Sequence, residues 1–185
     1  MINKELSLRV LSIDPGFNNL GVAFSTLNYH SNLQVVNNVT TFNIPRLIRL
    51  DDDPLTDHVS HYLVNSKKVY DIIRYNLESC LPDVIICEAA YLGSFANAFV
   101  SLSLCIQAVE RAVYDYDFDV GFYTIDPSSV KKANGVKGNS KDKEEMRTAI
   151  IANPNIVSVV DFTKIDEHSV DAIAIGQCYF TRTRV

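Results

Sequence analysis

The sequence lacks three features that would assign it to a membrane, secreted or zinc-binding class. It has no apolar run of about 18 residues, the length that spans a bilayer. Its N-terminus has no basic segment followed by an apolar one, so we expect no signal peptide. The four cysteines form no Cys-x-x-Cys pair, which favours free thiols in a reducing compartment over a zinc site. We therefore expect an intracellular, cytoplasmic protein without a membrane partner.

An excess of positive charge is also missing. The formal net charge is −5, which argues against a protein that coats nucleic acid non-specifically. The basic residues are unevenly spread, however, and local patches rather than net charge make phosphate contacts. One cluster contains Lys131, Lys132, Lys137, Lys141, Lys143 and Arg147.

The length and composition predict one domain spanning residues 1–185, because 47% of the chain is hydrophobic. Apolar and β-branched patterns predict strands at residues 8–14, 20–27, 33–42, 83–88 and 120–125. Apolar residues at helical spacing predict helices at residues 53–80, 94–116, 140–152 and 169–179, and a short one from Asp126. Residues 43–52 and 135–139 are predicted as loops, and residues 157–162 as a short extended segment.

This order of elements predicts an α/β fold with a mixed five-stranded sheet. An antiparallel meander of three strands comes first, and strands connected through helices follow, which is typical of parallel pairing. The helices would then flank the sheet on its faces.

Two acidic residues stand at the ends of predicted apolar strands. Asp14 ends the first strand before a Pro-Gly turn, and Glu88 ends the continuous apolar run Val-Ile-Ile-Cys. A buried carboxylate costs desolvation energy unless a partner, often a metal ion, compensates it. The two strands are expected to be neighbours, so both carboxylates would lie at the edge where ligand sites of open α/β sheets occur.

A third acidic position lies on the last predicted helix. His168 and Asp171 are three residues apart and share one helix face. The small apolar residues after Asp171 would let this helix pack closely on the sheet, so that Asp171 approaches the strand ends. Carboxylates are the ligands that Mg²⁺ prefers, and two Mg²⁺ ions can activate water and stabilise a leaving alkoxide. The set predicts a metal-dependent phosphodiesterase.

Each of these residues also has an ordinary structural explanation. Asp14 could be a turn residue, and Asp171 could be a helix N-terminal charge that the dipole favours. His168 could be a surface or capping residue. The occurrence of all of them in this order favours the functional interpretation.

Four motifs, in order, resemble those of the RuvC family of Holliday-junction resolvases in the RNase H-like superfamily. The first two are Ile13-Asp14-Pro15-Gly16 and Ile86-Cys87-Glu88-Ala89-Ala90-Tyr91. The third is the basic segment Pro127-Ser128-Ser129-Val130-Lys131-Lys132, followed by Gly135, Gly138, Lys141 and Lys143. The fourth is His168-Ser169-Val170-Asp171-Ala172-Ile173-Ala174-Ile175, in a variant with histidine at its first place. The similarity covers most of the chain.

The resemblance implies a homodimer that cuts four-way DNA junctions with Mg²⁺, or with Mn²⁺ in its place, and no small-molecule cofactor. It implies two ions per site, held by the catalytic residues Asp14, Glu88, His168 and Asp171. The residues implied in DNA binding are Tyr91, Lys131, Lys132, Lys137, Lys141 and Lys143. Such phosphate contacts make binding strongly salt-dependent. The helix at residues 94–116 would suit a dimer interface or an ordinary core, and Tyr91 could equally cap that helix.

Two departures from the family pattern leave the cleavage preference open. The chain is net acidic, and the stretch between Asp14 and Glu88 is long, which fits a divergent member such as those carried by bacteriophages. A related nuclease acting on a flap or an RNA–DNA hybrid, and a non-catalytic junction-binding protein, are the alternatives. An actin-like ATPase is disfavoured because it needs two such domains, and 185 residues leave room for one.

Overall fold

The computed structural model describes residues 7–50, 60–92, 96–138 and 142–184. Its centre is a mixed sheet in the order β5-β4-β1-β2-β3-β6. The strands are β1 (Ser7–Asp14), β2 (Asn19–Asn28), β3 (Leu33–Asn43), β4 (Val84–Glu88), β5 (Gly121–Ile125) and β6 (Ile156–Ser158). The first three form the antiparallel meander, and β4 and β5 add to β1 in parallel. The predicted class of fold is confirmed.

The predicted number of strands is wrong, because the sheet has six strands and not five. The extra strand β6 pairs in parallel with β3 at Gln34, Val35 and Val36. It falls at the start of the segment predicted as extended. A strand of three residues is too short for an alternating pattern, so its place in the sheet depends on tertiary packing.

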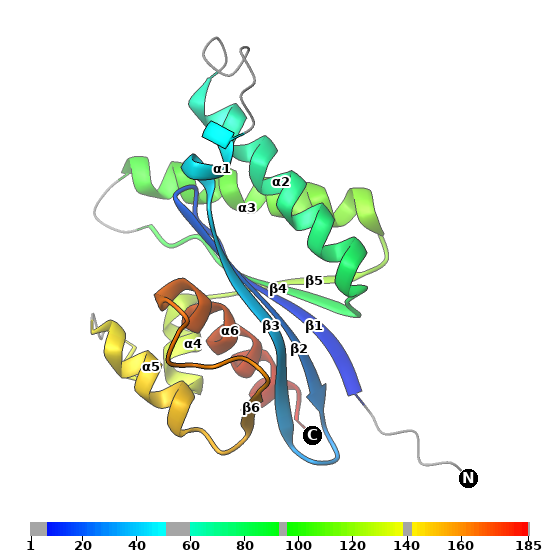
Figure 1. Cartoon of the computed structure of the whole chain (residues 1–185), viewed down its shortest axis with the longest axis vertical. Coiled ribbons are helices and arrows are strands. Elements are labelled where there is room, and N and C mark those ends of the chain that lie inside the picture. Colours follow the sequence, from blue (N-terminus) through cyan, green and yellow to red (C-terminus); the bar gives the residue numbers. More distant parts are fainter. Residues whose placement is uncertain (1–6, 51–59, 93–95, 139–141, 185) are drawn as a thin grey trace.

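Helices cover both faces of the sheet (Figure 1). One face carries α1 (Ile44–Leu50), α2 (His61–Cys80) and α3 (Ala96–Tyr116), and the other carries α4 (Pro127–Ala133), α5 (Lys143–Ala152) and α6 (Glu167–Thr183). Alternate residues of β1 face opposite sides: Leu11 and Ile13 belong to the core under α2 and α3, and Val10 to the core under α6. None of the helices among the described residues is long and apolar enough to cross a membrane.

The prediction of a loop at residues 43–52 is wrong, because α1 forms there. The Asn43 side chain accepts a hydrogen bond from the backbone N–H of Arg46 at 3.0 Å, as a helix N-cap does. Pro45 in the first turn has the backbone angle that a helix start requires. A capping asparagine followed by proline was therefore a usable helix signal.

The long helix α2 is confirmed, with its end at Cys80 and with Leu81 in the left-handed conformation (φ 46°). Its predicted start at Asp53 lies outside the described residues; within them, α2 begins after Ser60. The predicted capping residue Ser140 of the next helix likewise lies outside the described residues, and α5 is capped by Asp142.

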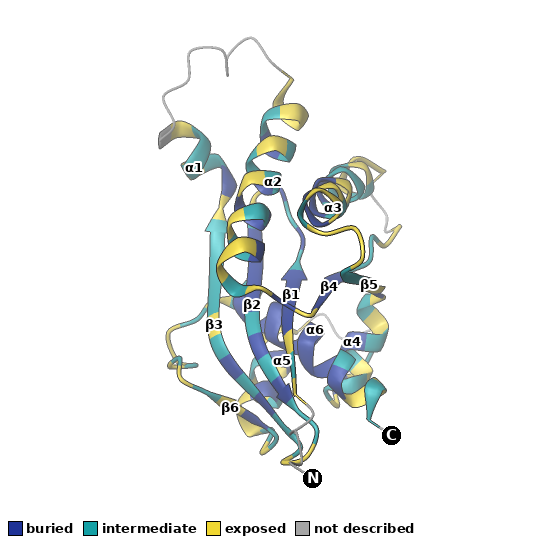
Figure 2. Ribbon diagram, turned by 90° about the vertical axis from the view of Figure 1, so that its right-hand side faces the viewer, coloured by how far each residue is buried: buried dark blue, intermediate teal, exposed yellow. Residues whose placement is uncertain are grey.

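The last helix, α6, carries His168 and Asp171 and packs closely on the sheet. Residues 172–178 are all buried, and the helix packs on β1, β2 and β3, as the buried colouring of α6 in Figure 2 shows. Two glycines permit this close packing. A Cβ at Gly21 of β2 would overlap the backbone carbonyl oxygen of His168, and one at Gly176 would lie 2.9 Å from Gln34 Nε2.

We predict that Gly21→Ala destabilises the protein by about 1–3 kcal/mol, because the new methyl group would push the first turn of α6 off the sheet. Gly138→Ala is the matched control, since a Cβ there meets its nearest atom at an ordinary 3.5 Å. Urea denaturation of the two variants measures the difference. Equal stability of both variants would show that α6 does not depend on this approach.

Candidate active site

Asp14 and Glu88 lie at the same end of two neighbouring parallel strands. β1 and β4 pair with Ile13 opposite Cys87, so that the next residue of each strand is one of the two acids. The strands bring these carboxyl groups together because both run in the same direction and end at the same edge. The expected adjacency of the two strands is confirmed.

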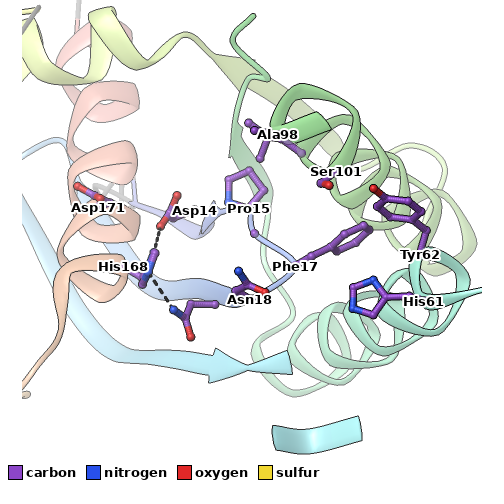
Figure 3. Close-up of a pocket in the computed structure, with 13 residues that line it drawn as sticks. Asp14, Pro15, Phe17, Asn18, His61, Tyr62, Ala98, Ser101, His168 and Asp171 are labelled. Atoms are coloured by element: carbon purple, nitrogen blue, oxygen red, sulfur yellow. Dashed lines mark hydrogen bonds and ion pairs between the residues drawn. The ribbon is translucent and has the colours of Figure 1, made fainter. Parts of the chain in front are cut away.

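His168 and Asp171 approach this edge from α6. The His168 Nδ1 atom lies 2.8 Å from Asp14 Oδ2, and Asp14, His168 and Asp171 line one cavity (Figure 3). Asp166 positions the helix, since its side chain accepts a hydrogen bond from the backbone N–H of Ser169 at 2.9 Å. Glu88 does not line the cavity.

The three carboxyl groups nevertheless affect one another electrostatically. Burial, together with the charges of Asp14 and Asp171, raises the pKa of Glu88 to about 8. Burial and the charge of Asp14 raise the pKa of Asp171 to about 6. Burial also raises the pKa of Asp14, although the hydrogen bond from His168 opposes the rise. Mutual repulsion of buried negative charges is a situation that a bound cation relieves.

The side chains are not gathered around a single point. Among the described residues, no group of three His, Cys, Asp or Glu side chains could hold a metal ion as it stands. His168 is engaged with Asp14 through Nδ1, and its Nε2 atom lies 3.3 Å from Asn19 Nδ2. One of its two ring nitrogens would have to give up its partner before it became a ligand.

Asn19 is a site residue that the sequence reasoning missed. Asn43 Nδ2 donates to Asn19 Oδ1 at 3.0 Å, and this leaves the Asn19 amide nitrogen to face His168. An amide N–H can only donate, so His168 Nε2 must accept and the proton of the neutral ring belongs on Nδ1. The hydrogen bond to Asp14 raises the pKa of His168. Asn19 begins β2 directly after the turn that follows Asp14, and no local pattern marks its contact with a residue of the last helix.

The described lysines that were predicted to bind DNA lie on α4, on α5 and in the segment between these helices. Lys131 and Lys132 are on α4, Lys137 is exposed after it, and Lys143 begins α5. Lys141 lies outside the described residues. Tyr91, which follows β4, is 70% exposed.

Two of these lysines are close enough to the acids to affect them. The charge of Lys131 lowers the pKa of Glu88, and the charge of Lys143 lowers the pKa of Asp14 and Asp171. Lys143 also pairs with Glu167 on α6 at 2.5 Å. Cations therefore border the acidic edge, in an arrangement that can hold phosphate beside it.

We predict that neutral His168 carries its proton on Nδ1. Nitrogen NMR in alkaline solution should show Nε2 without a proton in the unsubstituted protein. Asn19→Ala should produce a mixture of both tautomers, because the donor to Nε2 is gone. Asn37→Ala, which removes a bond to Thr26 elsewhere on the sheet, is the control. A proton on Nε2 in the unsubstituted protein would contradict the assignment.

We predict that Glu88→Gln stabilises the metal-free protein at alkaline pH by on the order of 1–3 kcal/mol. The Glu88 carboxyl group loses its proton near pH 4.5 in the unfolded chain and near pH 8 in the folded chain. Between these values the folded state binds more protons, so stability falls as the pH rises. Glutamine does not titrate, so the substitution removes this loss of stability with rising pH.

Thermal unfolding with a chelator across this pH range measures the effect. The exposed Glu145→Gln on α5 is the control. An identical pH dependence of the Glu88→Gln variant and the unsubstituted protein would contradict the prediction. Added Mg²⁺ or Mn²⁺ should stabilise the unsubstituted protein more than the Glu88→Gln variant.

Comparison with known proteins gives similarity in structure but not in sequence. No protein-family model and no curated protein matches the sequence. RuvC of T. thermophilus in complex with Holliday junction substrate matches with a TM-score of 0.73 and 17% identity, covering 96% of this chain and 95% of that one. Another Thermus thermophilus RuvC structure gives 0.68 and 17%, covering 97% and 96%.

The yeast mitochondrial Holliday junction resolvase Ydc2 also matches, with a TM-score of 0.64 and 15% identity. This match covers 94% of the present chain and 79% of the yeast protein. The agreement extends over nearly the full length of the described fold. The chain thus has the same fold as these RuvC and Ydc2 structures.

Proposed function

We propose that this protein is a divalent-metal-dependent endonuclease that resolves four-way DNA junctions. The observation that carries the proposal is the convergence of Asp14, Glu88, His168 and Asp171 at one edge of the sheet, in a RuvC fold. A similar structure contains RuvC with a Holliday junction substrate. This likeness makes branched DNA the substrate to test first.

The donor set fits Mg²⁺ or Mn²⁺. Three carboxylates and one imidazole are mainly oxygen donors. Burial, and then the charge of neighbouring carboxylates, raises the pKa values of Glu88 and Asp171, and a bound cation would offset both effects. Asp14, Glu88 and Asp171 would hold the ions, together with one ring nitrogen of His168 once that nitrogen gives up its present partner. Metal ions bound there would supply an activated water and stabilise the leaving oxygen of the phosphodiester.

The chain's own residues then have separate tasks. Before a metal ion binds, Asp14 holds the His168 ring through Nδ1, and Asn19 holds it from the other side. Lys131 and Lys143 lie near the acids and offset their repulsion of DNA phosphates. Lys132 and Lys137 extend the basic surface, and the exposed Tyr91 is available to contact bases at the branch point.

A homodimer would place two such sites on one junction. The C-terminal half of α3 lies in the core, at Cys105, Ala108, Val109, Ala112 and Val113. Its N-terminal half is partly or fully exposed and includes Val100, which is 46% exposed. The Val100 side of this half, and not the side at Ala98, Ser101 and Leu102 that lines the cavity, is the surface that we assign to the dimer contact. A two-fold axis needs one self-complementary patch.

We predict symmetric paired nicks on a synthetic four-way junction with Mg²⁺, and none on linear duplex. Asp14→Asn should lower the rate by roughly 100-fold or more, since it removes a charge at the reacting centre. Asp71→Asn, which breaks an exposed ion pair with Lys67 on α2, should cleave normally. Gel analysis of end-labelled strands gives both positions and rates.

Flap and RNA–DNA hybrid substrates complete the experiment. Cleavage of either one in preference to the junction would change the proposed substrate but not the proposed metal site. Tight junction binding without cleavage in Mg²⁺ or Mn²⁺ would indicate a non-catalytic junction-binding protein.

A further inference from the structure

The cavity at Asp14 extends beyond the acidic edge. It has a volume of about 630 Å³, within the range of small-ligand sites. Its acidic end holds Asp14, His168 and Asp171, and its other end is aromatic. Figure 3 shows Phe17, His61 and Tyr62 on the opposite side of the cavity from His168 and Asp171.

The aromatic end contains two exposed rings backed by a buried one. Phe17 is 8% exposed and belongs to the core under α2 and α3. The ring centroid of Tyr62 lies 6.3 Å from that of Phe17 and 6.0 Å from that of His61, which is within the usual range of aromatic pairs. Tyr62 is still 40% exposed, so part of the ring remains available to a ligand.

Two of these rings start a helix, and one of them has a hydrogen-bonding contact that restrains it. His61 and Tyr62 belong to the first turn of α2, where the backbone N–H of Val64 bonds to Ser60. His61 Nε2 lies 3.3 Å from Nδ2 of the buried Asn65. A ring held in this way loses little conformational entropy on binding.

The facing wall is formed by α3 through the small residues Ala98 and Ser101 and by Leu102. Of the described residues that line the cavity, none is lysine or arginine. Among these described residues, the aromatic end therefore has no lysine or arginine side chain to attract a phosphate. It offers ring faces and a hydroxyl group, which suit a flat, neutral, polar-edged group.

From this geometry we infer that the Phe17–His61–Tyr62 end of the cavity is a subsite for one unpaired nucleobase of the DNA substrate, next to the phosphate that is cut. The inference rests on the proposed nuclease function. Base pairs at a branch point are easily opened, and stacking on a protein ring offsets the cost of opening one. Stacking on an aromatic side chain contributes about 5- to 100-fold in affinity per base.

The test is a cycle of two changes, one in the protein and one in the DNA. Tyr62→Leu removes the ring, and an abasic nucleotide removes the base at each position flanking the cleaved bond in turn. We expect Tyr62→Leu to slow single-turnover cleavage about 5- to 100-fold on the intact junction. At one abasic position, the substitution should have no further effect, because ring and base act as a pair.

Two variants separate stacking from folding. Tyr62→Phe keeps the ring, so it should slow cleavage less than Tyr62→Leu does, and the two variants should cleave alike at the abasic position where ring and base no longer pair. Tyr75→Leu on the same helix removes a ring that is 70% exposed and does not line the cavity, so it should have no effect. Thermal unfolding of each variant confirms that it is folded.

Normal cleavage by a folded Tyr62→Leu variant would overturn the subsite. So would a loss of cleavage rate that is equal with and without each flanking base. Neither outcome would contradict the proposed nuclease activity. If the unsubstituted protein cuts no substrate, the proposed function fails. In that case, fluorescence anisotropy measures the affinity for the junction with the same combinations of the Tyr62→Leu variant and the abasic nucleotide. Coupling between ring and base in that assay would still support the subsite, and its absence would overturn it.

Discussion

The close contact between α6 and β2 at Gly21 is the constraint on which the acidic site depends. Gly21 pairs with Asp14 across the first two strands, and the backbone of His168 lies against it. Any larger residue there would hold the helix away from the sheet. The His168 ring reaches Asp14 at 2.8 Å because the first turn of α6 sits at this depth. The glycine in the second strand is thus as much a part of the site as the acids.

Packing of α6 and of the two cores explains how the fold tolerates buried carboxyl groups that oppose folding. Burial raises the pKa of Glu88, Asp14 and Asp171, because it disfavours each charged form, and the charged forms repel one another. The cores on the two faces of the sheet hold the strand ends and α6 in place despite this repulsion. Active sites often keep such unfavourable charge because chemistry requires it. The unfavourable burial of three neighbouring carboxyl groups therefore marks this edge of the sheet as the candidate site.

The sequence predicted the elements whose patterns are local and long. The three strands of the meander, the end of α2 at Cys80 and the strand before Glu88 have strong apolar patterns, and the structure contains them. The three-residue spacing of His168 and Asp171 also predicted their shared helix face. The helix at Ile44–Leu50 was missed although Asn43 and Pro45 marked its start, because its apolar pattern is short.

Other features are not encoded in any local pattern. β6 exists because three residues fit beside β3. Asn19 contacts His168 although 149 residues separate them in the chain. The aromatic end of the cavity combines the turn after β1 with the start of α2. Such contacts follow from the path of the whole chain, so a search of motifs finds the acids but not the groups that position them.

The net charge of −5 misleads if it is applied to the site as a whole. DNA meets a protein through charges within about one Debye length, roughly 8–10 Å in physiological salt. Lys131 and Lys143 are close enough to the acids to lower the pKa values of these groups. An acidic centre with cations at its border attracts metal ions and phosphates together, whereas a uniformly basic surface would repel the metal. For this kind of chemistry, the order of charges across the site matters more than their sum.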